Sequence, residues 1–405
     1  MKKRLYYAWV NAALCVLVVF FCGTISQTYG VFLPAISEDL KISMSQISAA
    51  VTVLNAVMAV CGPLAASVVE KSNMRKTLPV VLACLAVILI MLAGCHHVLP
   101  IYILYALCGC CLYFGLFFLC PYIVNKWFRV RVAETIAFII TSMAVGGVAG
   151  NLVLSYLIDR YSWRIAYRTE ACFFFLLALL IALLLRDRPE EMGLEPYGSG
   201  QEEEKTAQTD RVGGEGLTLR QVMGLPAFYF IILYVAAMQF CVGMQSQIPT
   251  LGISMGLAAV CGAAAASLNS LGGIFAKAFL SVLNVKMGVV KSVVFYNLAG
   301  ILGICSVLYL KNKTGLYLFA LLFGFAIGST TVQLPLFSNR LFGASADYNK
   351  IHARIVMISG LLATPSALLA GAVYDATGSY CGMLCLMILL LAVAAVMARK
   401  VWKSA

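Results

Sequence analysis

The feature that most limits the possible folds is a series of long apolar stretches that recurs along the whole chain. A helix needs about 20 mainly apolar residues to cross the hydrocarbon core of a bilayer. We place twelve such spans at residues 7–33, 45–68, 77–95, 99–122, 135–157, 163–185, 226–249, 257–284, 291–310, 315–338, 351–374 and 380–398. Their apolar runs are continuous and not alternating, which argues against a β-barrel. The sequence therefore predicts an all-α membrane protein with twelve transmembrane helices.

Composition agrees with a lipid-facing surface, since 62% of the residues are hydrophobic and only 11% are charged. A soluble domain is about half apolar and a quarter charged. The first apolar run, from about Tyr7 to Phe32, follows a basic start but is too long for the core of a secretory signal. We therefore expect an uncleaved first helix. All fifteen cysteines fall inside these apolar stretches, where they act as small buried hydrophobes, and no metal or cofactor is expected.

The net charge of +12 could suggest nucleic-acid binding, but the basic residues are spread in short clusters after every second span. If both termini are cytoplasmic, the inner segments carry 22 lysines and arginines and the outer loops carry 6. This asymmetry is what the positive-inside rule produces. It predicts a multi-pass protein of the cell (inner) membrane with cytoplasmic termini, in contact with the lipid bilayer and with no nucleic-acid partner.

The two halves of the sequence resemble each other. Asn125–Phe128 follows span four and Asn339–Phe342 follows span ten, at an offset of 214 residues. Parallel repeats of this kind are used by secondary transporters for alternating access. The expected organisation is a six-helix bundle at 1–185, a polar cytoplasmic linker at 186–220 and a second, pseudo-symmetric six-helix bundle at 221–405.

Several short motifs extend this interpretation. They are Tyr6–Val10, Tyr29–Pro34, Lys126–Phe128, Ser162–Arg164, Arg186–Gly193 and Tyr374–Tyr380. In these motifs the chain resembles the major facilitator superfamily over nearly its whole length, and within it the oxalate/formate-antiporter and monocarboxylate-porter branch. The resemblance implies the major facilitator fold and the function of a transporter, not of an enzyme. It also implies a protein that usually works as a monomer. In the oxalate-carrying members a second cation lies in span eleven, whereas 357–366 has none here, which argues against a dicarboxylate.

Lys277 is the sharpest indication of a substrate site, because a charged side chain inside a span normally faces a bundle interior or a wet cavity. Ser270 and Gly273 precede it at helical spacing on the same face, and the glycine would let a ligand or a neighbouring helix approach closely. By resemblance, Lys277 lies where related anion porters bind the substrate carboxylate. A lysine near a helix end can also simply extend to the membrane interface.

Glu170 is the one acidic residue well inside a span. It is either a proton-coupling carboxyl or a structural ion pair with a residue such as Arg164 or Arg168, and we favour the ion pair. Gln239 and Tyr113 are further candidates for the substrate path. In the predicted cytoplasmic gating loops we single out Glu70, Arg75 and Lys286.

These features predict a carrier of small organic anions, most simply monocarboxylates, that works by anion exchange (antiport) or by facilitated or proton-coupled transport (symport). Two alternatives remain open. One is an efflux carrier for a larger hydrophobic compound, in which Lys277 would matter little. The other is a membrane sensor, which would call for an added soluble domain that the short linker does not provide.

Overall fold

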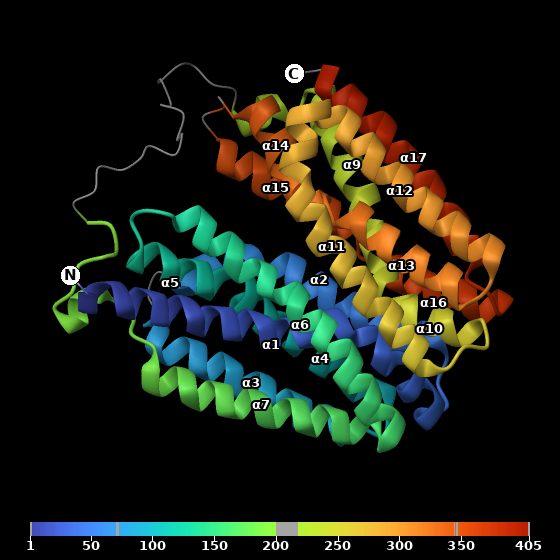
Figure 1. Ribbon diagram of the computed structural model, residues 1–405, viewed down its shortest axis with the longest axis horizontal. Coiled ribbons are helices and arrows are strands. Elements are labelled where there is room, and N and C mark those ends of the chain that lie inside the picture. The colour runs from blue at the N-terminus through green and yellow to red at the C-terminus, as the bar shows by residue number, and fades with distance from the viewer. Residues whose placement is uncertain (1, 70–72, 200–217, 344, 346, 404–405) are drawn as a thin grey trace. The chain divides into compact units, whose positions relative to one another are not determined.

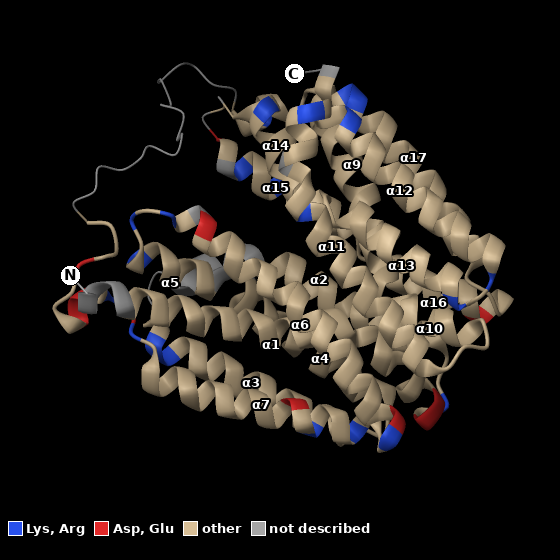
Figure 2. Ribbon diagram, in the orientation of Figure 1, with Lys and Arg blue, Asp and Glu red and all other residues tan. Residues whose placement is uncertain are grey.

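The computed structural model describes residues 2–69, 73–199, 218–343, 345 and 347–403. Within them, twelve helical segments are long and apolar enough to cross a membrane, which confirms the predicted number of spans. Figure 2 shows that lysine, arginine, aspartate and glutamate are concentrated near the ends of the helices, while the middle of most helices is free of charge. Regular β-strands are absent from the described residues, which contain one isolated bridge between Phe128 and Tyr197.

The chain divides into two compact units, Met1–Ile42 with Val53–Gln208 and Ser43–Thr52 with Thr209–Ala405. The helices up to residue 192 are α1 (Lys2–Leu40), α2 (Met44–Val69), α3 (Met74–Ala93), α4 (Val98–Tyr113), the π-helical η1 (Phe114–Leu119), α5 (Cys120–Trp127), α6 (Val132–Arg160), α7 (Trp163–Leu184) and the 3₁₀ turn η2 (Pro189–Met192). In the first unit α1 packs along α6, and α3 packs along α7 (Figure 1).

Glycines bring α1 and α6 together. A side chain at Gly23 would collide with the backbone of Met143, and one at Gly146 would collide with the carbonyl oxygen of Phe20. Small residues are used in this way in membrane bundles because they let helix backbones approach closely. The sequence run from Gly146 to Asn151 is thus part of a helix crossing.

The helices after the linker are α8 (Leu219–Val222), α9 (Pro226–Gly243), the 3₁₀ turn η3 (Met244–Gln247), α10 (Ile248–Ser254), α11 (Ala259–Met287), α12 (Val289–Leu310), α13 (Lys313–Gly328), α14 (Thr330–Phe342), α15 (Tyr348–Ala363), α16 (Ser366–Thr377) and α17 (Cys381–Lys403). In the second unit α13 packs against both α11 and α12, and α9 packs against α15 and α17. Its core is apolar and rich in aromatic side chains.

The first turns of α2 belong to the second unit because polar contacts attach them to it. The carboxylate of Asp375 in α16 accepts hydrogen bonds from the backbone amides of Met44 and Ser45, at 3.0 and 2.8 Å. The Gln247 amide donates to the Ser48 hydroxyl at 2.9 Å, and Tyr380 donates to the Gln247 carbonyl oxygen at 3.0 Å. These contacts explain why Ser43–Thr52 separates from the rest of its helix in the division into units.

Four spans that the sequence predicts as single helices are interrupted: α4–η1–α5, α9–η3–α10, α13–α14 and α15–α16. A proline lacks the backbone amide needed for the helical hydrogen bond and clashes with the preceding turn. Three interruptions lie at or within two residues of such a residue, namely Pro121, Pro249 and Pro365, whereas the break at Ser329 lies six residues before Pro335, which is inside α14. Local π and 3₁₀ turns are a common way to accommodate this strain.

Two of these interruptions occupy equivalent positions in the internal repeat. The offset of 214 residues places Phe114 and Gly115, where η1 begins, on Gly328 and Ser329, where α13 ends. Matching interruptions in corresponding spans of two repeats are typical of transporter binding regions.

Candidate functional site

Lys277 lies in α11, three residues before the end of the apolar span Ala259–Leu280. Its side chain is half-buried. No hydrogen bond or ion pair is recorded between its ammonium group and any described residue. An ammonium inside a membrane-spanning segment is costly to leave without a partner. The ammonium is therefore available to an anion that is not part of the described chain.

The other two members of the predicted stripe make different contacts. Gly273 faces α13, where a side chain on Gly328 would come within 2.6 Å of the Gly273 Cα atom. Ser270 is buried and donates to the carbonyl oxygen of Ala266 in its own helix, at 3.3 Å. Of the two roles considered for Gly273, the structure shows contact with a neighbouring helix.

Gln239 and Tyr113 are both half-buried. Gln239 lies in α9, five residues before η3, and Tyr113 is the last residue of α4, directly before η1. Both candidates thus lie within interrupted spans, on the N-terminal side of the interruption.

Glu170 lies in α7 with only 3% of its surface exposed. One carboxyl oxygen accepts a hydrogen bond of 2.6 Å from the Thr24 hydroxyl on α1, and the other has no partner among the described residues. The favoured ion pair is not among the recorded contacts. Arg164 instead pairs with Asp39 at 2.5 Å, and Arg168 is exposed. Both arginines lie toward the start of α7, where they can reach water or other charged groups.

The Glu170 carboxyl lines a small cavity inside the first unit, together with residues of α1, α2, α3 and α4. The hydroxyl of Tyr29, also in this lining, is buried without a partner among the described residues. The hydroxyls of Tyr105 and Tyr167 are hydrogen-bonded to each other at 2.9 Å. The cavity therefore combines an apolar wall with hydroxyl groups and one carboxyl.

The predicted gating residues have different outcomes. Glu70 lies outside the described residues. Arg75 and Lys286 are exposed, and no ion pair is recorded for either side chain with another described residue. Their gating role stays a prediction.

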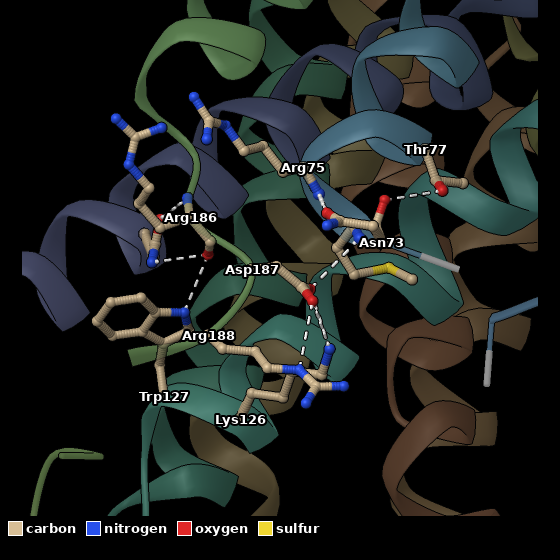
Figure 3. A network of polar contacts seen from close by, with 10 residues as sticks. Asn73, Arg75, Thr77, Lys126, Trp127, Arg186, Asp187 and Arg188 are labelled. Atoms are coloured by element: carbon tan, nitrogen blue, oxygen red, sulfur yellow. Dashed lines mark hydrogen bonds and ion pairs between the residues drawn. The ribbon is translucent and has the colours of Figure 1, made fainter. Parts of the chain in front are cut away.

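Sequence reasoning missed a polar network that ties the start of the linker to the first unit (Figure 3). Asp187, which is 4% exposed, accepts hydrogen bonds from the Lys126 ammonium on both oxygens, at 2.9 and 3.0 Å. It also accepts a hydrogen bond from the Met74 amide at the start of α3, at 3.3 Å. The Trp127 indole donates to the Arg186 carbonyl oxygen at 3.1 Å. The Lys126–Phe128 and Arg186–Gly193 motifs meet here, which the sequence could not indicate.

Gln333 in α14, one of several polar residues that the sequence places near the middle of a span, is fully buried. Its carbonyl oxygen accepts a hydrogen bond of 2.6 Å from Tyr234 on α9, while its amide nitrogen has no partner among the described residues. The hydroxyl of Thr330 is also buried and unpaired within the described chain. The internal repeat also draws attention to them, because Thr330 directly follows the interruption at Ser329 and Gln333 lies four residues after it.

The described residues contain no group of three or more histidine, cysteine, aspartate or glutamate side chains placed to hold a metal ion. All fifteen cysteines are free thiols.

Comparison with known proteins identifies the family. The model of the Major Facilitator Superfamily matches residues 15–345. No curated protein sequence is significantly similar to the chain. Among solved structures, a point mutant of the nucleoside transporter NupG is similar with a TM-score of 0.76 and 10% identity, covering 97% of this chain and 99% of that one.

A bacterial homologue of the human lysosomal transporter Spinster, in an inward-facing and occupied conformation, has a TM-score of 0.72 and 13% identity, covering 100% of this chain and 98% of that one. At such identities the likeness shows the fold alone. Together with the family match and the twelve membrane-spanning helices, it establishes that the chain belongs to the major facilitator superfamily and is a multi-pass membrane transporter.

Proposed function

We propose that the chain carries small organic anions, most simply monocarboxylates, across the cell (inner) membrane by alternating access. The observation that carries this proposal is Lys277, a half-buried cation in a membrane-spanning helix with no recorded anionic partner among the described residues. An ammonium in that setting is best stabilised by a bound anion. A carboxylate supplies one negative charge and two hydrogen-bond acceptors for it.

A single cation favours a single carboxylate. The segment 357–366 in α15 and α16 contains no lysine or arginine, so it offers no second cation for a dicarboxylate. The spans that contain Gln239 and Tyr113 are rich in apolar and aromatic residues, as small-molecule pockets commonly are. A short aliphatic acid fits these properties better than a highly charged metabolite.

In our proposal the two bundles rock about the substrate and expose it to each side of the membrane in turn. The distribution of lysine and arginine supports an orientation with both termini in the cytoplasm. The carrier acts as a monomer, with cytoplasmic loops that include Glu70, Arg75 and Lys286 contributing to the closure of that side.

Counterflow into proteoliposomes tests the substrate class. The purified protein would be reconstituted with unlabelled acid inside, and uptake of labelled lactate, pyruvate, formate, acetate and oxalate would be measured. Labelled uridine serves as a comparison, because one structural neighbour is a nucleoside transporter. We expect uptake of at least one monocarboxylate and neither oxalate nor uridine. Folded protein that transports none of the monocarboxylates would refute the proposal.

A further inference from the structure

The buried carboxyl of Glu170 is not explained by substrate binding at Lys277. Glu170 lies in the first unit, inside the cavity between α1, α2, α3, α4 and α7. An isolated charged carboxylate in such a place costs several kcal/mol. A protonated carboxyl is buried far more cheaply when it can form hydrogen bonds. The groups around Glu170 therefore decide whether its carboxyl is protonated or charged.

The surroundings contain no cation among the described residues. The titratable groups around the carboxyl are Cys22 and Tyr29 on α1, Tyr105 and Cys108 on α4, and Tyr167 on α7 itself. The cavity residues from α2 and α3 are Leu54, Leu89 and Leu92. Every one of these groups is neutral in its ordinary form, so none of them balances a negative charge.

The hydrogen bonds leave room for one proton. The Thr24 hydroxyl occupies one oxygen of the carboxyl at 2.6 Å. The other oxygen and the Tyr29 hydroxyl are both buried and without a partner among the described residues. A proton on the free oxygen would remove the charge and make that oxygen a hydrogen-bond donor. The geometry thus accepts the acid form and penalises the anion.

We propose that Glu170 is the proton-binding group that couples anion transport to a proton gradient. Glu170 takes up one proton when its cavity is open to one side of the membrane, and releases it when the cavity is wetted from the other. The proposal rests on the proposed function, because it makes the process a symport of one proton with one monocarboxylate.

The charge balance supports one-to-one coupling. In the loaded carrier the substrate neutralises Lys277 and the proton neutralises Glu170. In the empty carrier the positive lysine and the negative glutamate also sum to zero. Lys277 and Glu170, counted with whatever each has bound, therefore have the same net charge in the loaded and in the empty carrier. For this reason the membrane potential does not act through these groups against the reorientation of either form.

The test compares gradient-driven uptake with counterflow in proteoliposomes containing the parent, Glu170→Gln or Glu134→Gln. Glu134 is the matched control, because its side chain is exposed at the start of α6. A gradient of about one pH unit, acid outside, should drive about tenfold accumulation of the acid by the parent and the control. Glu170→Gln should show no accumulation, yet its counterflow should remain measurable because exchange needs no net proton movement. Accumulation by Glu170→Gln equal to that of the parent, or no response of the parent to the gradient, would overturn the proposal.

Infrared difference spectroscopy separates this result from a failure of the proposed function. Titration from about pH 5 to about pH 9 spans the range in which buried carboxyls are known to exchange protons. The parent should show a protonated-carboxyl band that responds to pH and is absent from Glu170→Gln. If the parent transports no monocarboxylate, this band still decides the role of Glu170: a pH-dependent band supports a proton site, and its absence refutes one.

Discussion

Replacement of Asp187 should destabilise the first unit, because Asp187 joins three parts of it (Figure 3). Its buried carboxylate receives the Lys126 ammonium on both oxygens and the Met74 amide on one. Breaking a buried ion pair from one side costs about 3–5 kcal/mol. The Lys126 side chain is 18% exposed, so water can partly solvate it after Asp187→Ala. We therefore expect the lower end of that range, about 3 kcal/mol.

Two further variants separate the charge from the packing. Asp187→Asn keeps an acceptor for the Met74 amide but removes the charge opposite Lys126, and should cost about 2 kcal/mol. The double variant Lys126→Met with Asp187→Leu replaces the pair by apolar side chains of similar size. Replacements of this kind are often nearly neutral, so it should recover most of the lost stability.

Unfolding of the reconstituted variants in lipid nanodiscs provides the measurement, followed by the fluorescence of the buried Trp127 next to the network. The coupling free energy between positions 126 and 187 comes from the double-mutant cycle. A change below about 0.5 kcal/mol for Asp187→Ala would place it among ordinary surface substitutions and refute the argument. So would a double variant as unstable as the two single changes added together.

Two further predictions concern the second unit. Gly324→Val should disrupt the crossing of α11 and α13, because the new side chain would collide with the Asn269 carbonyl oxygen. We expect the free energy of unfolding to fall by about 1–3 kcal/mol in a thermal unfolding assay. Unchanged stability would contradict this, because it would show that the two helices can move apart. The Lys350 ammonium and the Leu219 amide hold the pKa of the Asp347 carboxyl below its usual range, so this contact stabilises the fold above an ordinary aspartate pKa of about 3.9 and is lost as pH falls through the lowered value. The acid limb of the pH–stability curve should flatten in Asp347→Asn, and an identical limb would contradict this assignment.

The twelve spans could be predicted from the sequence because hydropathy over about 20 residues directly reflects the solvent around a helix. Span six, predicted at 163–185, is found at Trp163–Leu184. The interruptions of spans four, seven, ten and eleven were not predicted, since prolines give different outcomes in different settings. Pro34 lies within the unbroken α1, whereas π-helical turns precede Pro121. Whether a neighbouring helix tolerates the bend is a tertiary property that hydropathy does not contain.

The candidate site was predicted less completely. Lys277 and Glu170 stood out because charge inside a span is rare, but their partners depend on helix packing. Arg164 is near enough to Glu170 in the sequence to suggest an ion pair between them. In the structure, Arg164 forms an ion pair with Asp39 instead. From the sequence, Gly273 could allow the close approach of either a ligand or a neighbouring helix. The contact with Gly328 in α13 shows the approach of a helix. The pairing of residues far apart in sequence, such as Tyr234 with Gln333, leaves no local signal in the sequence.

Counterflow of the accepted monocarboxylate by Lys277→Ala tests the central claim most directly. Lys291→Ala is the matched control, because it removes an exposed lysine in the first turn of α12. A hydrogen bond to a charged group contributes about 1.5–3 kcal/mol, so Lys277→Ala should lower the apparent affinity or rate at least about tenfold. The control should transport like the parent. Equal transport by the parent, Lys277→Ala and the control would contradict the account that this lysine binds the substrate carboxylate.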